Sequence, residues 1–177
     1  GVFEAHAVLL GGRLPSTRRM SAAGSARWIG IHSHPDIETA AKAVELSPND
    51  AQGHFKLGEM YRRRQNTERA MVEFRKAIAK NDRLFRAYFA LAELLVSNDK
   101  VEEADRLYRR VVRSARDEQY VMRAARQSMQ INLGRGTLES LERELLPVAL
   151  GNPQKQIYRR LLVELYGAMT FPLVNAA

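Results

Sequence analysis

The residues of this sequence with the spacing of metal ligands are two histidines and one aspartate. His32, His34 and Asp36 stand at alternate positions beside Pro35, so that two imidazoles and one carboxylate could share a divalent cation. The cluster lacks a fourth ligand and the neighbouring polar groups that orient ligands in metal sites. We therefore expect solvated loop side chains here, and the sequence predicts no metal site.

No other group of residues has the composition of an active site. The glycine-containing stretches 10–13 and 133–136 lack the Lys-Ser/Thr ending and the preceding strand of a phosphate-binding loop. The sequence has no cysteine, which excludes thiolate nucleophiles, disulfides and zinc sites built from thiolates. Glu102 and Glu103 fall in the first turn of an expected helix, where carboxylates complement the helix dipole. We expect no catalytic residue, no cofactor and no enzymatic activity.

The composition is that of a basic helical protein. Its 177 residues include 28 Lys and Arg against 20 Asp and Glu, for a net charge of +8, and 45% are hydrophobic. Aromatic residues make up only 7%, while Ala, Leu, Arg and Glu are plentiful, which favours helices over strands. Most basic residues are interleaved with acidic ones at helical spacing, as on solvated helix surfaces. No apolar run is long enough for a membrane-spanning helix.

The first 35 residues differ in character from the rest. Glycine, proline and serine interrupt them, and the stretch from Arg13 to Arg27 contains no acidic residue. We predict an irregular leader over 1–35, for which an origin in cloning explains the composition better than an organellar transit peptide does. Part of 17–35 could also serve as a makeshift cap over the following helix. The compartment stays open, and the cytoplasm is favoured.

From residue 36 onward, apolar residues recur at helical spacing between short loops. Asn152-Pro153 is expected to start the last helix, and Pro147 to bend the helix before it. Because the loops have only about two to five residues, consecutive helices must pack antiparallel. The expected helices cover residues 36–46, 51–64, 67–80, 84–97, 100–115, 117–132, 137–150 and 152–170, and residues 171–177 form a tail.

Within these helices the sequence repeats itself with a period of 34 residues, the separation of His54 from Tyr88. A period of this size indicates a solenoid, and an ordinary helical bundle would not need small residues in the same places one period later. The small residues would let paired helices approach closely, and the larger ones would fill the spaces between units. The matching sets are His54, Leu57, Gly58, Tyr61, Ala70, Phe74 and Ala77, and then Tyr88, Leu91, Ala92, Leu95, Ala104, Tyr108 and Val111.

These residues resemble the motif of the tetratricopeptide repeat, a unit of two antiparallel helices. Residues 51–84 and 85–118 resemble complete repeats, and 36–50 resembles the end of a preceding one, so that 36–170 forms one repeat domain. The resemblance implies an all-α fold, a right-handed superhelical solenoid of antiparallel helix pairs. It also implies a protein-interaction module or scaffold that binds a partner peptide or helix in a concave groove, without catalysis.

Beyond these two units the likeness weakens. Extending the register places Arg126 where Gly58 and Ala92 stand, and a long arginine side chain cannot serve as a small contact. Residues 119–170 are therefore expected to form two degenerate helical hairpins, or to shift toward another helical repeat type such as HEAT. In the first complete unit, His54 occupies the slot of a large residue, where we expect half-buried packing.

The resemblance also implies which side chains face the groove. These are the second, fifth, ninth, twelfth and thirteenth residues of the first helix of each repeat. Helical spacing supports the choice independently, because positions three or four apart share one helix face. The predicted groove residues are Gln52, Phe55, Glu59, Arg62 and Arg63, and then Arg86, Phe89, Glu93, Val96 and Ser97.

The chemistry of these positions indicates a partner with acidic residues and an apolar anchor. Phe55 and Glu59 stand where the clamp for chaperone tails has Lys and Asn, so a chaperone carboxylate is not the expected ligand. An alternative interpretation is equally open, in which both phenylalanines belong to the core and the arginines are only solvated. A second function class also stays open: a basic helical-repeat domain that binds RNA or DNA.

The repeat register predicts that Ala70 and Ala104 are buried small contacts between paired helices. Replacing Ala70 with Leu would overpack that contact and lower the free energy of unfolding by roughly 1–3 kcal/mol. Thermal unfolding followed by circular dichroism measures the change. An unchanged melting temperature would contradict the register.

Overall fold

The computed structural model describes residues 37–170, and residues 1–36 and 171–177 lie outside the described part. By their contacts the residues separate into two units, Gly1–Asp36 and Ile37–Ala177. The leader, the tail and the cluster of His32, His34 and Asp36 therefore stay predictions. The described helices are α2 (Ile37–Leu46), α3 (Ala51–Arg63), α4 (Thr67–Lys80), α5 (Phe85–Ser97), α6 (Val101–Ser114), α7 (Glu118–Arg135), α8 (Leu138–Gly151) and α9 (Gln156–Thr170).

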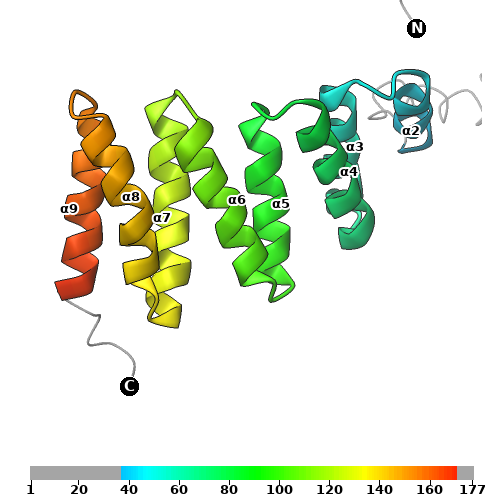
Figure 1. Cartoon of the computed structure of the whole chain (residues 1–177). Helices are drawn as coiled ribbons and strands as arrows, with labels where there is room; N and C mark the ends of the chain where they lie inside the picture. Colours follow the sequence, from blue (N-terminus) through cyan, green and yellow to red (C-terminus); the bar gives the residue numbers. More distant parts are fainter. Residues whose placement is uncertain (1–36, 171–177) are drawn as a thin grey trace, which may run out of the picture. The chain divides into compact units, whose positions relative to one another are not determined.

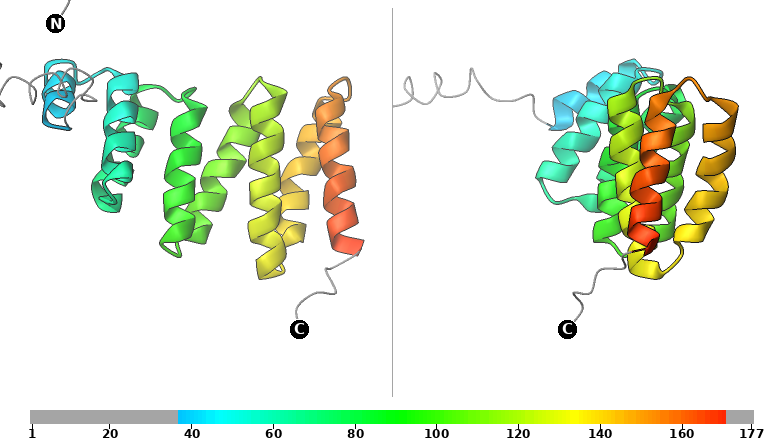
Figure 2. Two further views of the ribbon diagram at one scale, coloured as in Figure 1. Left: turned by 180° about the vertical axis from the view of Figure 1, so that it is seen from behind. Right: turned by 90° about the vertical axis from the view of Figure 1, so that its left-hand side faces the viewer.

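Within residues 37–170 all regular elements are helices, and each helix packs against the next one along the chain (Figure 1). Helix α7 also contacts α9 directly. Figure 2 shows α5, α7 and α9 in one layer and α6 and α8 in the other. The prediction of an all-α solenoid of paired helices is confirmed, and its right-handed twist stays a prediction. None of the described helices is long and apolar enough to span a membrane.

The turn after the first helix of each unit repeats along with the sequence. Gln65 and Asp99 follow α3 and α5, and both have φ of 59°, in the left-handed region. The next residue closes each turn in the same way, since Asn66 N–H donates to the carbonyl of Tyr61 and Lys100 N–H to that of Leu95, at 2.9 and 2.8 Å. The period of 34 is thus present in the backbone as well as in the side chains.

Small residues set the distance between the two helices of a unit. Ala70 and Ala104 are completely buried, as predicted, and so is Ala92. A methyl group added to Gly58 would lie 2.7 Å from two ring carbons of Phe74, closer than packed carbon atoms approach. Because the Phe74 ring is itself fully buried, it has little room to retreat. Glycine at position 58 therefore permits the close pairing of α3 with α4.

His54 differs from its expected role. The sequence predicts half-buried packing, whereas the structure leaves only 4% of the residue exposed and hydrogen-bonds both ring nitrogens. Nδ1 lies 2.7 Å from the carboxylate of Glu73, and Nε2 lies 3.2 Å from the carbonyl oxygen of Pro48. Glu73 also accepts a hydrogen bond from Lys76 at 2.8 Å. His54 therefore links α3 to α4 and to the loop before α3 through polar contacts. A comparison of side-chain sizes between the two units does not reveal such contacts.

A polar cluster, called the hub below, joins α6, α7 and α8, and it is buried except at Arg109, Ser140 and Glu144, which are partly exposed. Arg109 donates to Asp105 at 2.8 Å, to the Ser140 hydroxyl at 2.8 Å and to Glu144 at 2.6 Å. From α7, the Ser128 hydroxyl and the Asn132 amide both donate to Asp105. Buried polar atoms are tolerated when each has a partner. The hub consists of Asp105, Arg109, Ser128, Asn132, Ser140 and Glu144.

Two helix boundaries differ from prediction by about one turn. Helix α7 continues to Arg135, because Gly134 is accommodated within the helix and Gly136, with φ of 65°, provides the left-handed residue that ends it. The last helix begins at Gln156 instead of Asn152, because the Asn152 amide donates to Val148 at the end of α8 and does not cap α9.

Two glycines within helices give a matched test of close packing. Gly58→Ala forces a methyl group against Phe74, and we expect the overpacking cost of roughly 1–3 kcal/mol to exceed the gain of ~1 kcal/mol in helix propensity. In Gly134→Ala the added methyl group has no neighbouring atom within 4 Å, so only the gain in helix propensity applies. Chemical denaturation should show the first variant less stable and the second more stable than the parent. Equal shifts would contradict the packing argument.

Candidate functional site

The first helices of the units enclose a shallow hollow, called the groove below, with a volume of about 180 Å³. Helices α3, α5 and α7 all contribute to it. Helix caps fix two of these helices locally, because Asp50 accepts from the N–H of Gln52 and Asp117 from that of Gln119, at 2.9 and 2.8 Å. The groove is lined by Phe55, Glu59, Arg62, Arg86, Phe89, Ala90, Glu93, Tyr120 and Arg123.

Arginines cover the two phenylalanines of the groove. The Arg86 guanidinium lies 5.2 Å from the centre of the Phe55 ring, and that of Arg123 lies 4.3 Å from the centre of the Phe89 ring. Tyr120 stacks on Phe89 as well, with ring centres 6.1 Å apart. Phe55 and Phe89 are only 6% and 3% exposed. Both rings therefore belong to the core, and their faces are not open to an apolar anchor.

Two glutamates form ion pairs with two of the three arginines of the groove. Glu59 pairs with Arg62 at 2.8 Å, and Glu93 pairs with Arg123 at 3.0 Å. Within residues 37–170 no carboxylate lies within ion-pair distance of Arg86. Below the groove, burial raises the pKa of Tyr108 to about 12, an effect that Glu93 reinforces and Arg123 opposes. The groove thus presents three cations, one of them without a carboxylate partner in the described residues.

Most of the predicted groove residues come together in this hollow. Six of the ten predicted residues line it, whereas Gln52 and Arg63 do not. Val96 and Ser97 also lie outside it. That these side chains bind a partner stays a prediction. The six that line the groove are Phe55, Glu59, Arg62, Arg86, Phe89 and Glu93.

Sequence reasoning missed Tyr120 and Arg123, although the signal was present. Adding one period of 34 to Arg86 and Phe89 leads to Tyr120 and Arg123. The prediction stopped at residue 118 because Arg126 breaks the pattern of small residues. In the structure Arg126 is exposed and turned toward α9, so the break affects one face of α7 while the groove face continues.

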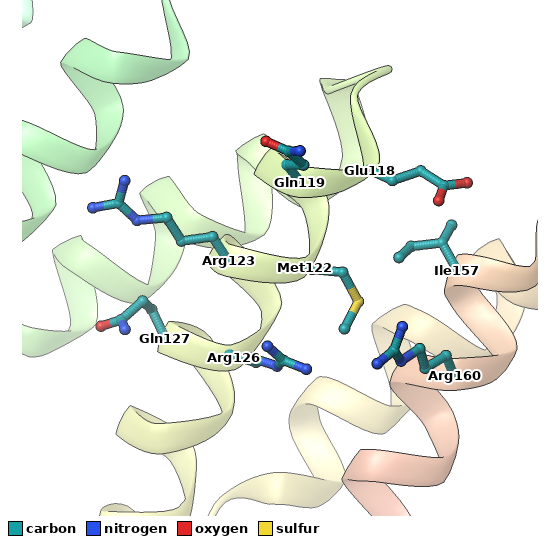
Figure 3. A pocket seen from close by; sticks show the side chains of 8 residues that line it. All are labelled: Glu118, Gln119, Met122, Arg123, Arg126, Gln127, Ile157 and Arg160. Atoms are coloured by element: carbon teal, nitrogen blue, oxygen red, sulfur yellow. The ribbon is translucent and has the colours of Figure 1, made fainter.

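A second hollow, called the cleft below, lies between α7 and α9 and has a volume of about 500 Å³ (Figure 3). Arg123 lines both hollows, so the cleft continues the groove along the same layer of helices. Arg126 donates two hydrogen bonds to Glu164, at 3.0 and 2.9 Å, and Arg160 lies 3.8 Å from the same carboxylate. The cleft is lined by Glu118, Gln119, Met122, Arg123, Arg126, Gln127, Ile157 and Arg160.

Alternating helix layers with a charged groove on the first helices define a helical-repeat protein. Residues 85–118 match the family model of the tetratricopeptide repeat. Together with the eight consecutive helices of the described part, this match fits a tetratricopeptide-like repeat. Such repeats are protein–protein interaction modules and are typically not catalytic. No curated protein matches the sequence.

Within residues 37–170 no group of three His, Asp or Glu side chains is arranged to hold a metal ion. The groove and the cleft are the candidate functional surfaces, because arginine side chains line both hollows.

The Arg126–Glu164 pair predicts a specific dependence of stability on pH. Its hydrogen bonds lower the pKa of Glu164, and burial opposes them. The pair therefore stabilises the fold above the ordinary pKa of about 4.5, and this contribution is lost as the pH falls through the lowered value. We expect Glu164→Gln to lose less stability than the parent between neutral pH and about pH 3, measured by denaturation at each pH.

The matched control is Glu139→Gln on α8. This substitution removes an exposed carboxylate that has no ion pair within the described residues. Its pH dependence should follow that of the parent. If the free energy of unfolding of Glu164→Gln changed with pH in the same way as that of the parent, the coupling of α7 to α9 through this pair would be contradicted.

Proposed function

We propose that this protein is an interaction module that binds an acidic segment of a partner protein in the groove formed by α3, α5 and α7. The observation that supports this most is the pair of guanidinium groups held over buried phenyl rings, Arg86 on Phe55 and Arg123 on Phe89. Successive repeats supply them, so they form a short series along the layer of first helices.

Stacking prepares these arginines for recognition. A guanidinium group over an aromatic face keeps its N–H donors at the edge, where they can meet a carboxylate in two parallel hydrogen bonds. An exposed arginine loses side-chain entropy when it binds, and contact with a ring reduces that loss because the side chain is already restricted. Arg86 is the best-placed group, since it has no carboxylate within ion-pair distance in the described residues.

The acidic side chains of the groove favour a peptide over a nucleic acid. Glu59 and Glu93 lie among the arginines, and they would repel a continuous phosphate backbone more than a segment with separate carboxylates. Sequence-tolerant binding of single strands also uses open aromatic faces for base stacking. Here arginine and tyrosine side chains already cover both phenyl rings.

A reversal of charge tests the groove. We expect Arg86→Glu/Arg123→Glu to bind acidic peptides about tenfold to a hundredfold more weakly than the parent, because two charge-assisted contacts become repulsive. The peptides come from selection of a random peptide library on the immobilised parent protein. Selection should enrich Asp and Glu, and fluorescence anisotropy measures the affinities.

The matched control is Arg143→Glu/Arg159→Glu, which reverses two exposed arginines of α8 and α9 outside both hollows. It changes the net charge equally and should retain nearly full affinity. Circular dichroism checks that both variants keep their helices. Selected peptides without acidic enrichment, equal losses in both variants, or tighter binding of an RNA oligonucleotide than of any peptide would contradict the proposal.

A further inference from the structure

The cleft between α7 and α9 contains the apolar surface that the groove lacks. Met122 and Ile157 are its apolar lining residues, and Figure 3 shows the Met122 side chain directed toward α9, on the side of Ile157. Ile157 is buried, while Met122 is partly exposed. Met122, which is flexible and partly exposed, therefore provides the accessible apolar surface, and Ile157, at 7% exposed, supports it from α9.

Polar groups that suit an extended peptide surround this apolar surface. Gln119, Arg123 and Gln127 are spaced four residues apart, so they share one face of α7. No side-chain hydrogen bond engages the amide of Gln119 or Gln127 within the described residues. Each amide offers both donors and an acceptor, which are the groups that match the N–H and C=O of a peptide backbone.

Two arginines that line the cleft already bind a carboxylate of the protein itself. Arg126 and Arg160 approach the same carboxylate from two helices, that of Glu164. Two guanidinium groups around one carboxylate leave a positive excess, and Arg160, with its side chain 70% exposed, keeps N–H donors for a second acceptor. A partner segment with an acidic residue next to an apolar one could therefore place the apolar side chain on Met122 and the acidic side chain on Arg160.

We propose that the cleft is the specificity pocket of the groove, and that it receives an apolar side chain of the acidic partner segment against Met122. A neighbouring acidic residue of the same segment binds Arg160. Arg123 lines both hollows, so one extended segment can pass from the groove into the cleft. This inference rests on the proposed function, and it assigns the apolar contact to α7 and α9, away from the closed rings of Phe55 and Phe89.

Two synthetic peptides test the pocket. The first is a short peptide of Asp and Glu with one central leucine, and the second has serine in place of leucine. The parent should bind the leucine peptide about tenfold more tightly, because an apolar side chain leaves water. Equal affinity for the two peptides would overturn the pocket and leave the groove intact. No affinity for either peptide would overturn the proposed function and the pocket with it.

Matched variants place the preference within the protein. Met122→Gln should abolish the difference between the two peptides, whereas Met60→Gln, the same change on α3 outside both hollows, should keep it. Arg86→Glu/Arg123→Glu should weaken binding of both peptides. A preference for leucine that survives Met122→Gln would overturn the assignment.

Photo-crosslinking locates the apolar side chain directly. A diazirine analogue of leucine replaces the leucine of the peptide, and mass spectrometry identifies the labelled residues of the parent protein. We expect labels on 118–127 and on 156–160. Labels concentrated on α3, or on the α4, α6 and α8 layer, would overturn the pocket even if the leucine peptide binds more tightly.

Discussion

The close approach of paired helices at Gly58 is the contact on which the arrangement depends. Phe74 fills the space that a side chain at position 58 would occupy, and Ala92 takes the same place in the next unit with a single methyl group. Because the helices of a pair lie so close, the first helices can form a continuous layer. The groove and the cleft are surfaces of that layer, so the proposed recognition site depends on a packing contact beneath it.

The phenylalanines of the groove serve both the core and the surface. Phe55 lies 5.7 Å from Phe74, centre to centre, and Phe89 lies 5.8 Å from Tyr108, so each ring packs against the second helix of its own unit. Its other face carries a guanidinium group. A substitution at either ring would therefore alter stability and the orientation of an arginine together. This coupling explains why core and binding interpretations of the two residues looked equally good.

The sequence was sufficient for the repeat because the repeat depends on residue size at fixed spacing. Gly58, Ala70 and Ala104 carry that signal, and all three behave as expected. Contacts between residues far apart in sequence were not predictable in this way. The pairing of Arg126 with Glu164 joins two helices whose relative placement no local pattern specifies.

The boundaries and the site show a further limit. Asn152 could cap the following helix or bond to the preceding one, and in the structure its amide donates to the carbonyl of Val148 at the end of α8. The period of 34 relates Arg123 to Phe89, but Arg126 breaks the pattern of small residues, so the predicted groove does not extend to α7. The fold was thus predictable from spacing, whereas the extent of the site depended on which face of α7 had diverged.

The hub has a consequence for how the array unfolds. In a solenoid each unit is stabilised mainly by its neighbours, so an irregular junction can divide the chain into parts that melt separately. Asp105 and Arg109 belong to the second matching unit, and both hydrogen-bond across the junction to the divergent helices after it. Opening the junction would break the Arg109–Glu144 ion pair and the hydrogen bonds that Ser128 and Asn132 donate to Asp105. These bonds therefore link the regular and the divergent halves, despite the loss of the repeat pattern between them.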